Sequence, residues 1–444
     1  MMTYEEFRKS VLDTALALGC DAAETVFVEG DRFQAGVLAQ ELDSYSVSRK
    51  FGIGLRVQVN GRDGYAYTEK LDDPEALYRR ALDNARVIGT ADEHPMQGAQ
   101  DYAAVTMPDN PVCDMSEREK IELAMEAERR ALAADPRVER VSHNILATGH
   151  TTIHITNTLG LDARRSSSYS YSYIGPILRD GEEVHDGLAF RTGREMLDTA
   201  ALAQDAVQDG LSQFGAAPVD SGAYRILFKN TTAVDFFEAF MPMFSADQAQ
   251  KGLSPLAGRE GESIASAVVT LCDDPLHPVN PRAFDDEGTP SVTKTVVENG
   301  VFQTLLHNLK TAKKAGCAST SNADRPSAAS PVGIAPTNFY MVPGADNLES
   351  MKQRLGAGLM ITDVTGLHAG VNPVTGDFSL LSRGFLVENG EIVRPVDQIT
   401  IAGSFLKLLK DIEAVGSDLK FTLPGSTMLG MPSILVSSLM VAGK

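Results

Sequence analysis

The feature that most constrains the fold is a run in the C-terminal part of the chain where turn residues interrupt short β-prone segments. It reads GVNPVTGDFSLLSRGFLVENGEIVRPVDQITIAG, from Gly370 to Gly403. Apolar residues flank its Asn389-Gly390 pair, and a type I′ turn needs positive φ at both central positions. Asn372-Pro373 marks a further reversal. The run therefore predicts a tight hairpin within a region of short strands.

Helical and strand patterns alternate in the first half of the chain. Two helix starts carry capping boxes, Thr3 with Glu6 and Ser116 with Glu119. Apolar residues at helical spacing predict helices over 3–18, 74–87, 116–134 and 195–214. Strands are expected over 23–29, 33–39, 42–48, 54–59, 138–144, 151–156, 163–173 and 188–192.

A loop of small residues, GAAPVDSG at 215–222, separates the last of these helices from a new strand at 224–228. The sequence beyond it consists mostly of short strands, with helices expected at 231–244 and 403–412. We therefore predict an α+β protein. An N-terminal sheet-and-helix domain over residues 1–220 is followed by a mainly β C-terminal domain over residues 221–444.

The composition is that of a globular protein and argues against several classes of function. The 444 residues carry a formal net charge of −19, which disfavours nucleic acid as a partner because phosphate backbones are also negative. No apolar run approaches the roughly 20 residues of a membrane span, and no secretion signal is recognised. We expect a cytoplasmic protein with no membrane partner. Its four cysteines form no C-x-x-C pair and are expected to be reduced.

The Gly370–Gly403 run resembles the signature stretch of the TldD/PmbA family, and more closely that of its PmbA/TldE branch. In that branch a GVNxVTGDxS block precedes a GFxVENGEI hairpin and a PVxxITIAG strand. The resemblance extends over almost the whole chain. The other blocks that agree are FDDEG from Phe284, VENGV from Val297, STSNA from Ser319, PTNFY from Pro336 and GIGLRV from Gly52.

The resemblance implies a metallopeptidase fold, but the chain lacks the family's metal ligands. In the TldD branch, zinc is bound by an H-E-x-x-x-H helix and a cysteine near the C-terminus, and a hydrolytic zinc site needs about three protein ligands. None of the eight histidines here is followed by glutamate, and the motif positions read Phe237-Glu238-Ala239-Phe240-Met241-Pro242. The last cysteine is Cys317. We therefore expect no catalytic residue, metal or cofactor on this chain.

Three other patterns are assigned to structure rather than to chemistry. His150 and His154 lie in a β-prone stretch, where residues four apart are separated by about 13 Å and cannot share one metal. The run Asp285-Asp286-Glu287 matches no EF-hand spacing and is expected to be a solvated turn. Gly52-Ile53-Gly54 lacks the third glycine of a nucleotide-binding loop and is expected to form a tight β-bend.

The resemblance implies a metal-free subunit that pairs with a TldD-type chain. Together they would form a cytoplasmic metallopeptidase for unstructured peptides and for peptide maturation. Zinc and the catalytic glutamate would belong to the partner, and the isolated chain would be a homodimer. A strand edge can hydrogen-bond an extended peptide with little dependence on its side chains. The residues expected to line the peptide space are Glu238, His307, Asn308, Thr365, His368, Gly370 and Asn372.

Two other functions stay open on the sequence alone. A stand-alone metallopeptidase would need a set of metal ligands that the spacing does not reveal. A non-enzymatic, protein-binding regulator would agree with the family's older label, modulator of DNA gyrase. The acidic composition directs such binding toward proteins rather than DNA.

Overall fold

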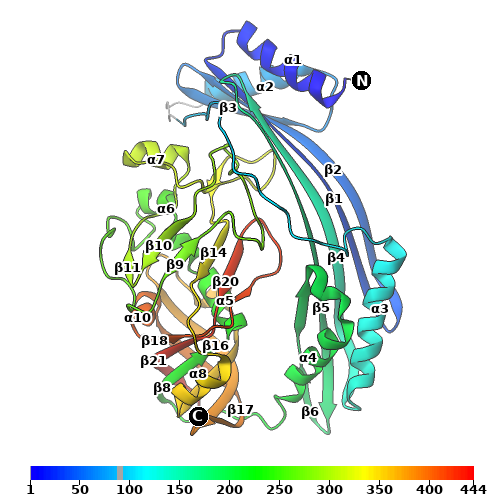
Figure 1. Cartoon of the computed structure of the whole chain (residues 1–444), viewed down its shortest axis with the longest axis vertical. Coiled ribbons are helices and arrows are strands. Elements are labelled where there is room, and N and C mark those ends of the chain that lie inside the picture. Colours follow the sequence, from blue (N-terminus) through cyan, green and yellow to red (C-terminus); the bar gives the residue numbers. More distant parts are fainter. Residues whose placement is uncertain (1, 88–93) are drawn as a thin grey trace.

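A long curved sheet lies beside a C-terminal body in the computed structural model, which describes residues 2–87 and 94–444 (Figure 1). The sheet has the strand order β3-β2-β1-β4-β5-β6, with β7 also paired to β5. Its neighbouring pairs are antiparallel. The strands are β1 (Ala22–Leu38), β2 (Glu41–Val59), β3 (Arg62–Thr68), β4 (Val138–Asn157), β5 (Asp162–Asp180), β6 (Glu183–Asp186) and β7 (Ala189–Thr192).

The central strands of this sheet are much longer than expected. Three continuous strands, of 17, 19 and 20 residues, each take the place of two predicted strands. The predicted strands that merge are 23–29 with 33–39, 42–48 with 54–59, and 138–144 with 151–156. The prediction of separate shorter strands is therefore wrong. The polar residues between the predicted segments stay extended because each one is in register with a residue of the neighbouring strand, as Asp31 is with Arg49.

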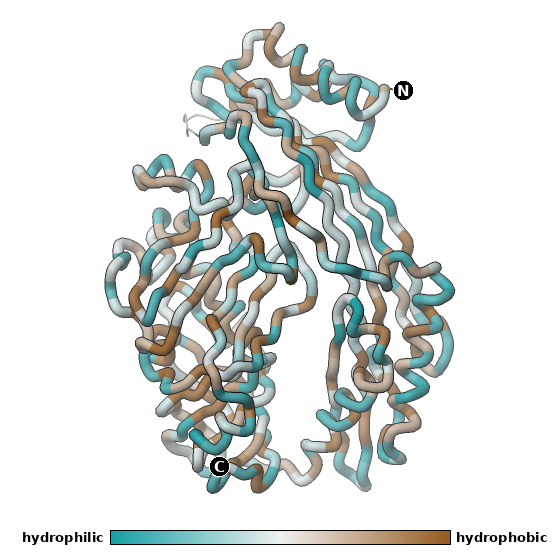
Figure 2. The backbone as a smooth tube through the Cα atoms, in the orientation of Figure 1, coloured by the Kyte–Doolittle hydropathy of each residue, from teal (hydrophilic) through white to brown (hydrophobic). Residues whose placement is uncertain are grey.

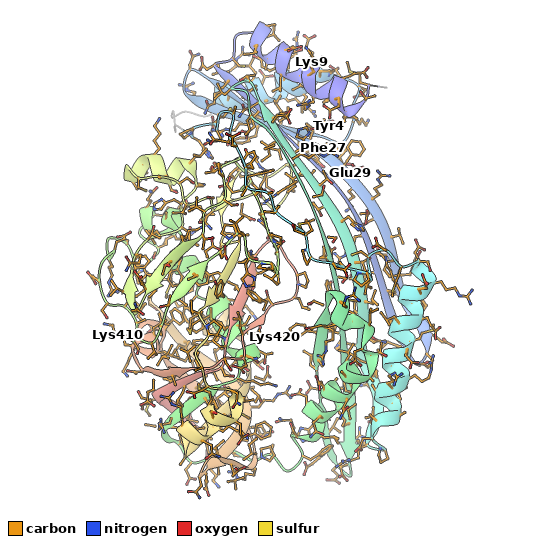
Figure 3. All side chains as sticks on the ribbon, in the orientation of Figure 1. Tyr4, Lys9, Phe27, Glu29, Lys410 and Lys420 are labelled. Carbon is orange, nitrogen blue, oxygen red and sulfur yellow. The ribbon has the colours of Figure 1, made fainter. Side chains whose placement is uncertain are left out.

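Four helices pack on one face of the sheet. The capping boxes of Thr3 and Ser116 are confirmed, and each starts a helix where predicted. The first two helices bury Phe27 of β1, and the third buries Phe33 of the same strand face. Tyr4 stacks on Phe27 with ring centroids 4.0 Å apart (Figure 3). The helices are α1 (Tyr4–Ala17), α2 (Pro74–Val87), α3 (Glu117–Ala134) and α4 (Thr199–Leu211), the last preceded by a 3-10 turn, η1 (Gly193–Leu197).

The C-terminal body contains two sheets of six strands each and a two-stranded ribbon. The first has the order β11-β10-β9-β14-β20-β19 and the second β17-β16-β15-β8-β21-β18. The strands are β8 (Gly222–Phe228), β9 (Leu271–Asp273), β10 (Lys294–Glu298), β11 (Val301–Phe302), β12 (Ala323–Asp324), β13 (Gly333–Ile334), β14 (Asn338–Met341), β15 (Gly358–Thr365), β16 (Asp377–Glu388), β17 (Glu391–Ser404), β18 (Ile412–Val415), β19 (Lys420–Phe421), β20 (Met428–Met431) and β21 (Ile434–Ala442). The α+β prediction is confirmed.

The hairpin predicted from the opening run is present. Asn389 and Gly390 have φ values of 53° and 79° and connect β16 to β17, as a type I′ turn requires. Asn299 and Gly300 repeat this geometry between β10 and β11. Turn chemistry therefore determines the register of both hairpins.

Short helices connect the C-terminal strands. The helix predicted at 231–244 ends early because Pro242 lacks the N–H that would continue it, and a 3-10 turn follows. The segment predicted at 403–412 is helical only in its middle. Four of the helices were not predicted: α6, α7, α8 and α9. The elements are α5 (Asn230–Glu238), η2 (Met241–Phe244), α6 (Ala246–Gln250), α7 (Leu309–Ala315), α8 (Leu348–Leu355), α9 (Leu367–Gly370) and α10 (Phe405–Lys410).

The body and the upper part of the sheet are joined by buried charged residues. Arg165 of β5 pairs with Asp286, and Arg325 lies 3.6 Å from Glu24 of β1. Glu287 contacts His94 through its side chain. The expectation of a solvated turn at Asp285-Asp286-Glu287 is wrong, since these residues are 4%, 4% and 2% exposed. They are buried because the sheet covers them.

Gly54 shows how closely the two parts approach. It is part of the continuous strand β2, so the predicted β-bend is wrong. A Cβ at this position would lie 2.0 Å from the carbonyl oxygen of Ala328. The glycine is therefore explained by the close approach of the body to the sheet and not by a turn.

Hydrophilic and hydrophobic residues are mixed along the tube of the long strands (Figure 2). In the part of the chain that the structure describes, no helix combines the length and the apolar composition needed to cross a bilayer.

The main core depends on aromatic residues around α5. The ring of Phe236 lies 4.8 Å from that of Phe378 and 5.6 Å from that of Phe228, and all three side chains are buried. We predict that Phe236→Ala lowers the free energy of unfolding in urea by about 3 to 5 kcal/mol, because it removes a large buried side chain. Leu381→Ala, at a 53% exposed position, should change it by less than about 0.5 kcal/mol. Equal losses in the two variants would contradict this assignment of the core.

Candidate functional site

A cleft of about 450 Å³ opens on the C-terminal body beside α5. One wall is formed by the end of this helix and the other by the segment around α9. The lining residues are Asp235, Glu238, Ala239, Leu367, His368, Val371 and Pro373. Its size is that of a small-molecule or side-chain site, and its walls combine carboxylates, an imidazole and apolar groups.

The amphipathic pattern of α5 places the two carboxylates in the cleft. Asp235 and Glu238 are three residues apart and therefore share a helix face. Phe236 and Phe237 lie on the other side of the helix and are buried in the core. The packing of the phenylalanines thus determines where the carboxylates point.

The electrostatics of the cleft favour protonated carboxyl groups. Burial, together with the nearby carboxylates of Glu238 and Asp363, raises the pKa of Asp235 to about 6. Burial also raises the pKa of Glu238. Both side chains nevertheless keep exposed surface toward the cleft, so the walls crowd them without sealing them from water. A cation entering the cleft would relieve their mutual repulsion.

The loop that forms the second wall is shaped by backbone requirements. Gly366 has a φ of 89° and precedes α9. A Cβ on Gly370 would lie 2.3 Å from the carbonyl oxygen of Ser379, so only glycine fits there. The side-chain oxygen of Asn372 accepts hydrogen bonds from the N–H groups of Val374 and Thr375 at 3.0 and 3.3 Å. Gly370 and Asn372 therefore shape the wall, whereas His368 reaches the cleft.

Two of the residues predicted to line the peptide space, Glu238 and His368, are brought together in this cleft. Thr365 is exposed at the end of β15, just before the loop. His307 and Asn308 do not line the cleft and are only 6% and 4% exposed. Their prediction as lining residues therefore gains no support from their position.

His307 and Asn308 instead organise the neighbouring loop. The carbonyl oxygen of His307 accepts hydrogen bonds from the N–H groups of Thr320 and Asn322 at 3.3 and 3.2 Å. The side-chain oxygen of Asn308 caps α7 by accepting the N–H of Thr311 at 3.0 Å. Burial lowers the pKa of His307. The cap accounts for the polar side chain of Asn308, whereas these hydrogen bonds of His307 involve its backbone, and its side-chain Nδ1 is buried without a hydrogen-bond partner in the described structure.

The residues at the zinc-motif positions do not fit a metal site. Phe237 is 1% exposed, and its ring lies 5.1 Å from that of Phe405. Pro242 belongs to η2 and carries no ligand atom on its side chain. Within residues 2–87 and 94–444, no group of three or more histidine, cysteine, aspartate or glutamate side chains is placed to bind a metal ion.

Asp235 and the apolar wall residues were missed by the sequence analysis. The spacing of Asp235 and Glu238 on a predicted helix was a usable signal, since residues three apart share a face. Leu367, Val371 and Pro373 gave no such signal, because their position depends on how the loop folds back toward α5.

A ladder of three tyrosines on β5 lies near this region. The rings of Tyr169, Tyr171 and Tyr173 stack at 6.3 Å intervals. Tyr173 is paired with Phe190 of β7, and the ammonium of Lys420 lies 4.8 Å from the centroid of the Phe190 ring. Paired residues share a sheet face, so the ladder points toward the C-terminal body. Lys420 (Figure 3) lies in β19, which packs beside α5.

Three family models match the chain in succession. They are described as PmbA/TldA metallopeptidase domain 1, central domain and C-terminal domain, and they match residues 23–85, 110–213 and 221–443. A curated relative, a metalloprotease PmbA homolog of Haemophilus influenzae, is 27% identical and is aligned over 99% of this chain and 96% of its own length. The metalloprotease PmbA of Escherichia coli O157:H7 is 26% identical over 99% of this chain and 98% of its own length.

Solved structures agree with these matches. A Thermotoga maritima protein described as a candidate modulator of a DNA gyrase is 35% identical, with a TM-score of 0.92 over 99% of this chain and all of its own. TldE from Thermococcus kodakarensis has the same fold, with a TM-score of 0.90, 24% identity and coverage of 98% of this chain and all of its own. From its sequence matches and its fold, the chain belongs to the PmbA/TldD metallopeptidase family.

Proposed function

We propose that this chain is the metal-free, PmbA/TldE-type subunit of a two-chain cytoplasmic metallopeptidase. It holds unstructured peptides for cleavage, including those that mature by proteolysis. Zinc and the catalytic glutamate are supplied by a TldD-type partner. The chain contributes the cleft between α5 and α9 as part of the peptide-binding surface.

One observation carries this proposal: the helix α5 lies beside a cleft, while its two ligand positions are occupied by a buried phenylalanine and an exposed proline, neither of which can bind a metal. Phe237 contributes to the aromatic core, and Pro242 ends the helix. Glu238 still faces the cleft. The scaffold therefore retains a binding surface without the groups that hydrolysis by a metal needs.

Peptide capture agrees with the chemistry of the surrounding surface. The cleft has apolar walls with two carboxylates at its side, which suits an apolar or a basic side chain. The stacked tyrosines of β5 are half-buried and face the body. Rigid aromatic surfaces bind peptides at low cost in side-chain entropy. A substrate between these surfaces would contact both parts of the chain.

The proposal is tested by measuring zinc and peptide cleavage. The purified chain should contain no stoichiometric zinc and should not cleave an unstructured peptide by itself. Adding a TldD-type chain from the same organism should yield a zinc-containing complex that cleaves the peptide. Cleavage by the lone chain with one zinc per protomer would support a stand-alone peptidase instead. A stable complex that leaves cleavage unchanged would support a regulatory role.

Filling the cleft should impair the complex without affecting its zinc. We expect Ala239→Trp to lower kcat/KM of the mixture at least tenfold, about 1.4 kcal/mol, because the indole occupies space at the end of α5. The partner's zinc content and the affinity between the chains should be unchanged. Val292→Trp, at a 54% exposed position of the same body, is the matched control. An active Ala239→Trp complex would show that the cleft does not hold the substrate.

The binding of basic peptides should depend on pH through Asp235. Its pKa is raised to about 6, so its carboxyl group gains negative charge as the pH rises from 5 to 7. The affinity of the isolated chain for a lysine-containing peptide should therefore increase by about three- to tenfold over this range, measured by fluorescence anisotropy. Asp235→Asn should flatten this pH dependence. An acidic peptide of equal length should show no such increase.

A further inference from the structure

A row of aromatic side chains on β5 faces the C-terminal body and does not line the cleft. Tyr169, Tyr171 and Tyr173 alternate along the strand, and their rings stack at 6.3 Å intervals. Arg165, which pairs with Asp286 of the body, lies an even number of residues from all three and so shares their sheet face. The three side chains are half-buried. Their hydroxyl groups have no hydrogen-bond partner among the described residues.

Arg32 lies beside the first ring of this tyrosine ladder. It is in register with Gly149 of β4, which is itself in register with Tyr169, so the three share one row and one sheet face. The Tyr169 ring lies over Gly149, where a Cβ would be only 2.7 Å from its Cε1 atom. Burial raises the pKa of Tyr169, and the positive charge of Arg32 opposes this shift. The neighbouring Asp31 points to the other face, where it lies 3.1 Å from His150.

Lys420 lies at the opposite corner of the ladder, beside the last ring. Its ammonium is 4.8 Å from the centroid of the Phe190 ring, and Phe190 pairs with Tyr173. Lys420 belongs to β19 of the C-terminal body (Figure 3). Arg32 hydrogen-bonds only the neutral side chain of Gln34, at 2.6 Å. Neither cation is paired with a carboxylate in the part of the chain that the structure describes, although acidic residues outnumber basic ones by 59 to 40.

An extended peptide matches the spacing of the rings. In a β-strand, alternate side chains are about 6.6 to 6.8 Å apart, close to the 6.3 Å between successive rings of the ladder. Aromatic side chains two residues apart on such a peptide therefore contact successive tyrosines. Aromatic pairs of this kind are favourable, and rigid tyrosines lose little side-chain entropy on binding.

The two cations determine which residues suit the flanks of this segment. Carboxylates on either side of the aromatic residues neutralise Arg32 and Lys420 and accept hydrogen bonds from the tyrosine hydroxyls. Cationic flanks are repelled at both corners. The net charge of −19 disfavours acidic ligands at long range, but salt screens this effect beyond about 8 Å under physiological conditions. The charges at contact distance therefore decide the local preference.

We propose that the tyrosine ladder, with Arg32 and Lys420, is a second peptide subsite for an extended acidic segment with aromatic residues at alternate positions. It lies apart from the cleft beside α5, whose carboxylates suit basic or apolar side chains. One substrate is then held through two segments of opposite charge. The subsite rests on the proposed function, since its peptide is the substrate, but its binding is measurable on the isolated chain.

Fluorescence anisotropy with labelled, end-blocked peptides tests the charges. In about 0.15 M salt, the isolated chain should bind DSFSFSD at least about fivefold more tightly than KSFSFSK. The variant Arg32→Gln/Lys420→Gln should bind DSFSFSD about three- to tenfold more weakly, because both attractive charges are gone. The matched control Lys9→Gln/Arg129→Gln removes two positive charges from helices on the other face of the sheet and should bind like the wild type.

A second variant tests the rings. The wild-type chain should bind DSFSFSD at least about tenfold more tightly than DSASASD, which lacks the aromatic side chains. Tyr171→Ser, in the middle of the ladder, should reduce this preference to less than about threefold. Tyr171→Phe keeps the ring and should retain most of the preference. Circular dichroism checks that each variant is folded.

Cleavage by the two-chain mixture separates this subsite from the proposed function. With a TldD-type chain present, Arg32→Gln/Lys420→Gln should raise KM for a substrate that carries the DSFSFSD segment about three- to tenfold more than KM for one that lacks it. A mixture without any cleavage contradicts the proposed function, whereas peptide binding to the isolated chain still decides the subsite. Equal affinity of the wild-type chain for the three peptides, or an affinity that Arg32→Gln/Lys420→Gln leaves unchanged, would overturn the subsite.

Discussion

The structure depends on the buried charged junction between the long sheet and the C-terminal body. Arg165 pairs with Asp286, and Arg325 with Glu24, at the upper part of the sheet. The carboxylate of Asp285 accepts three backbone N–H groups and so fixes the loop that carries these residues. Burial raises the pKa of Glu24 and of Asp285, so removing one partner would leave an uncompensated polar group. The junction therefore determines how the body sits against the sheet.

This arrangement leaves other parts of the sheet available for contacts. Lower down, the body touches the sheet through single side chains, such as Arg383 with Asp186 at 3.3 Å and Lys420 over Phe190. The tyrosines of β5 face the body there, next to the strand that packs beside α5. The opposite edge, β2, extends beyond β3 and has no second neighbour among the described strands. One sheet thus has a face toward the C-terminal body and an edge without a second neighbour among the described strands.

The sequence predicted those elements whose signals are local. Asn389-Gly390 and Asn299-Gly300 form their turns because positive φ is a property of the residues themselves. The turn at Ala39 and Gln40 could not be predicted, since both have positive φ without being glycine. Their N–H groups are held at 2.8 and 2.7 Å by the carboxylate of Glu128, which is 89 and 88 residues away in sequence. The burial of Asp285-Asp286-Glu287 could not be predicted for the same reason, because the sheet that covers these residues is distant from them in sequence.

The candidate site shows how core packing fixes the direction of the side chains that line a cleft. The positions that would carry metal ligands contribute instead to folding, with Phe237 packed edge-to-face against Phe405 and Pro242 ending the helix. The carboxylates of Asp235 and Glu238 keep their direction because the phenylalanines between them anchor the opposite face of α5. A histidine at position 237 would remove a buried aromatic ring from the core and would place a polar group there. Phe237 is therefore tied to the stability of this helix, and a histidine in its place would require compensating changes around Phe405.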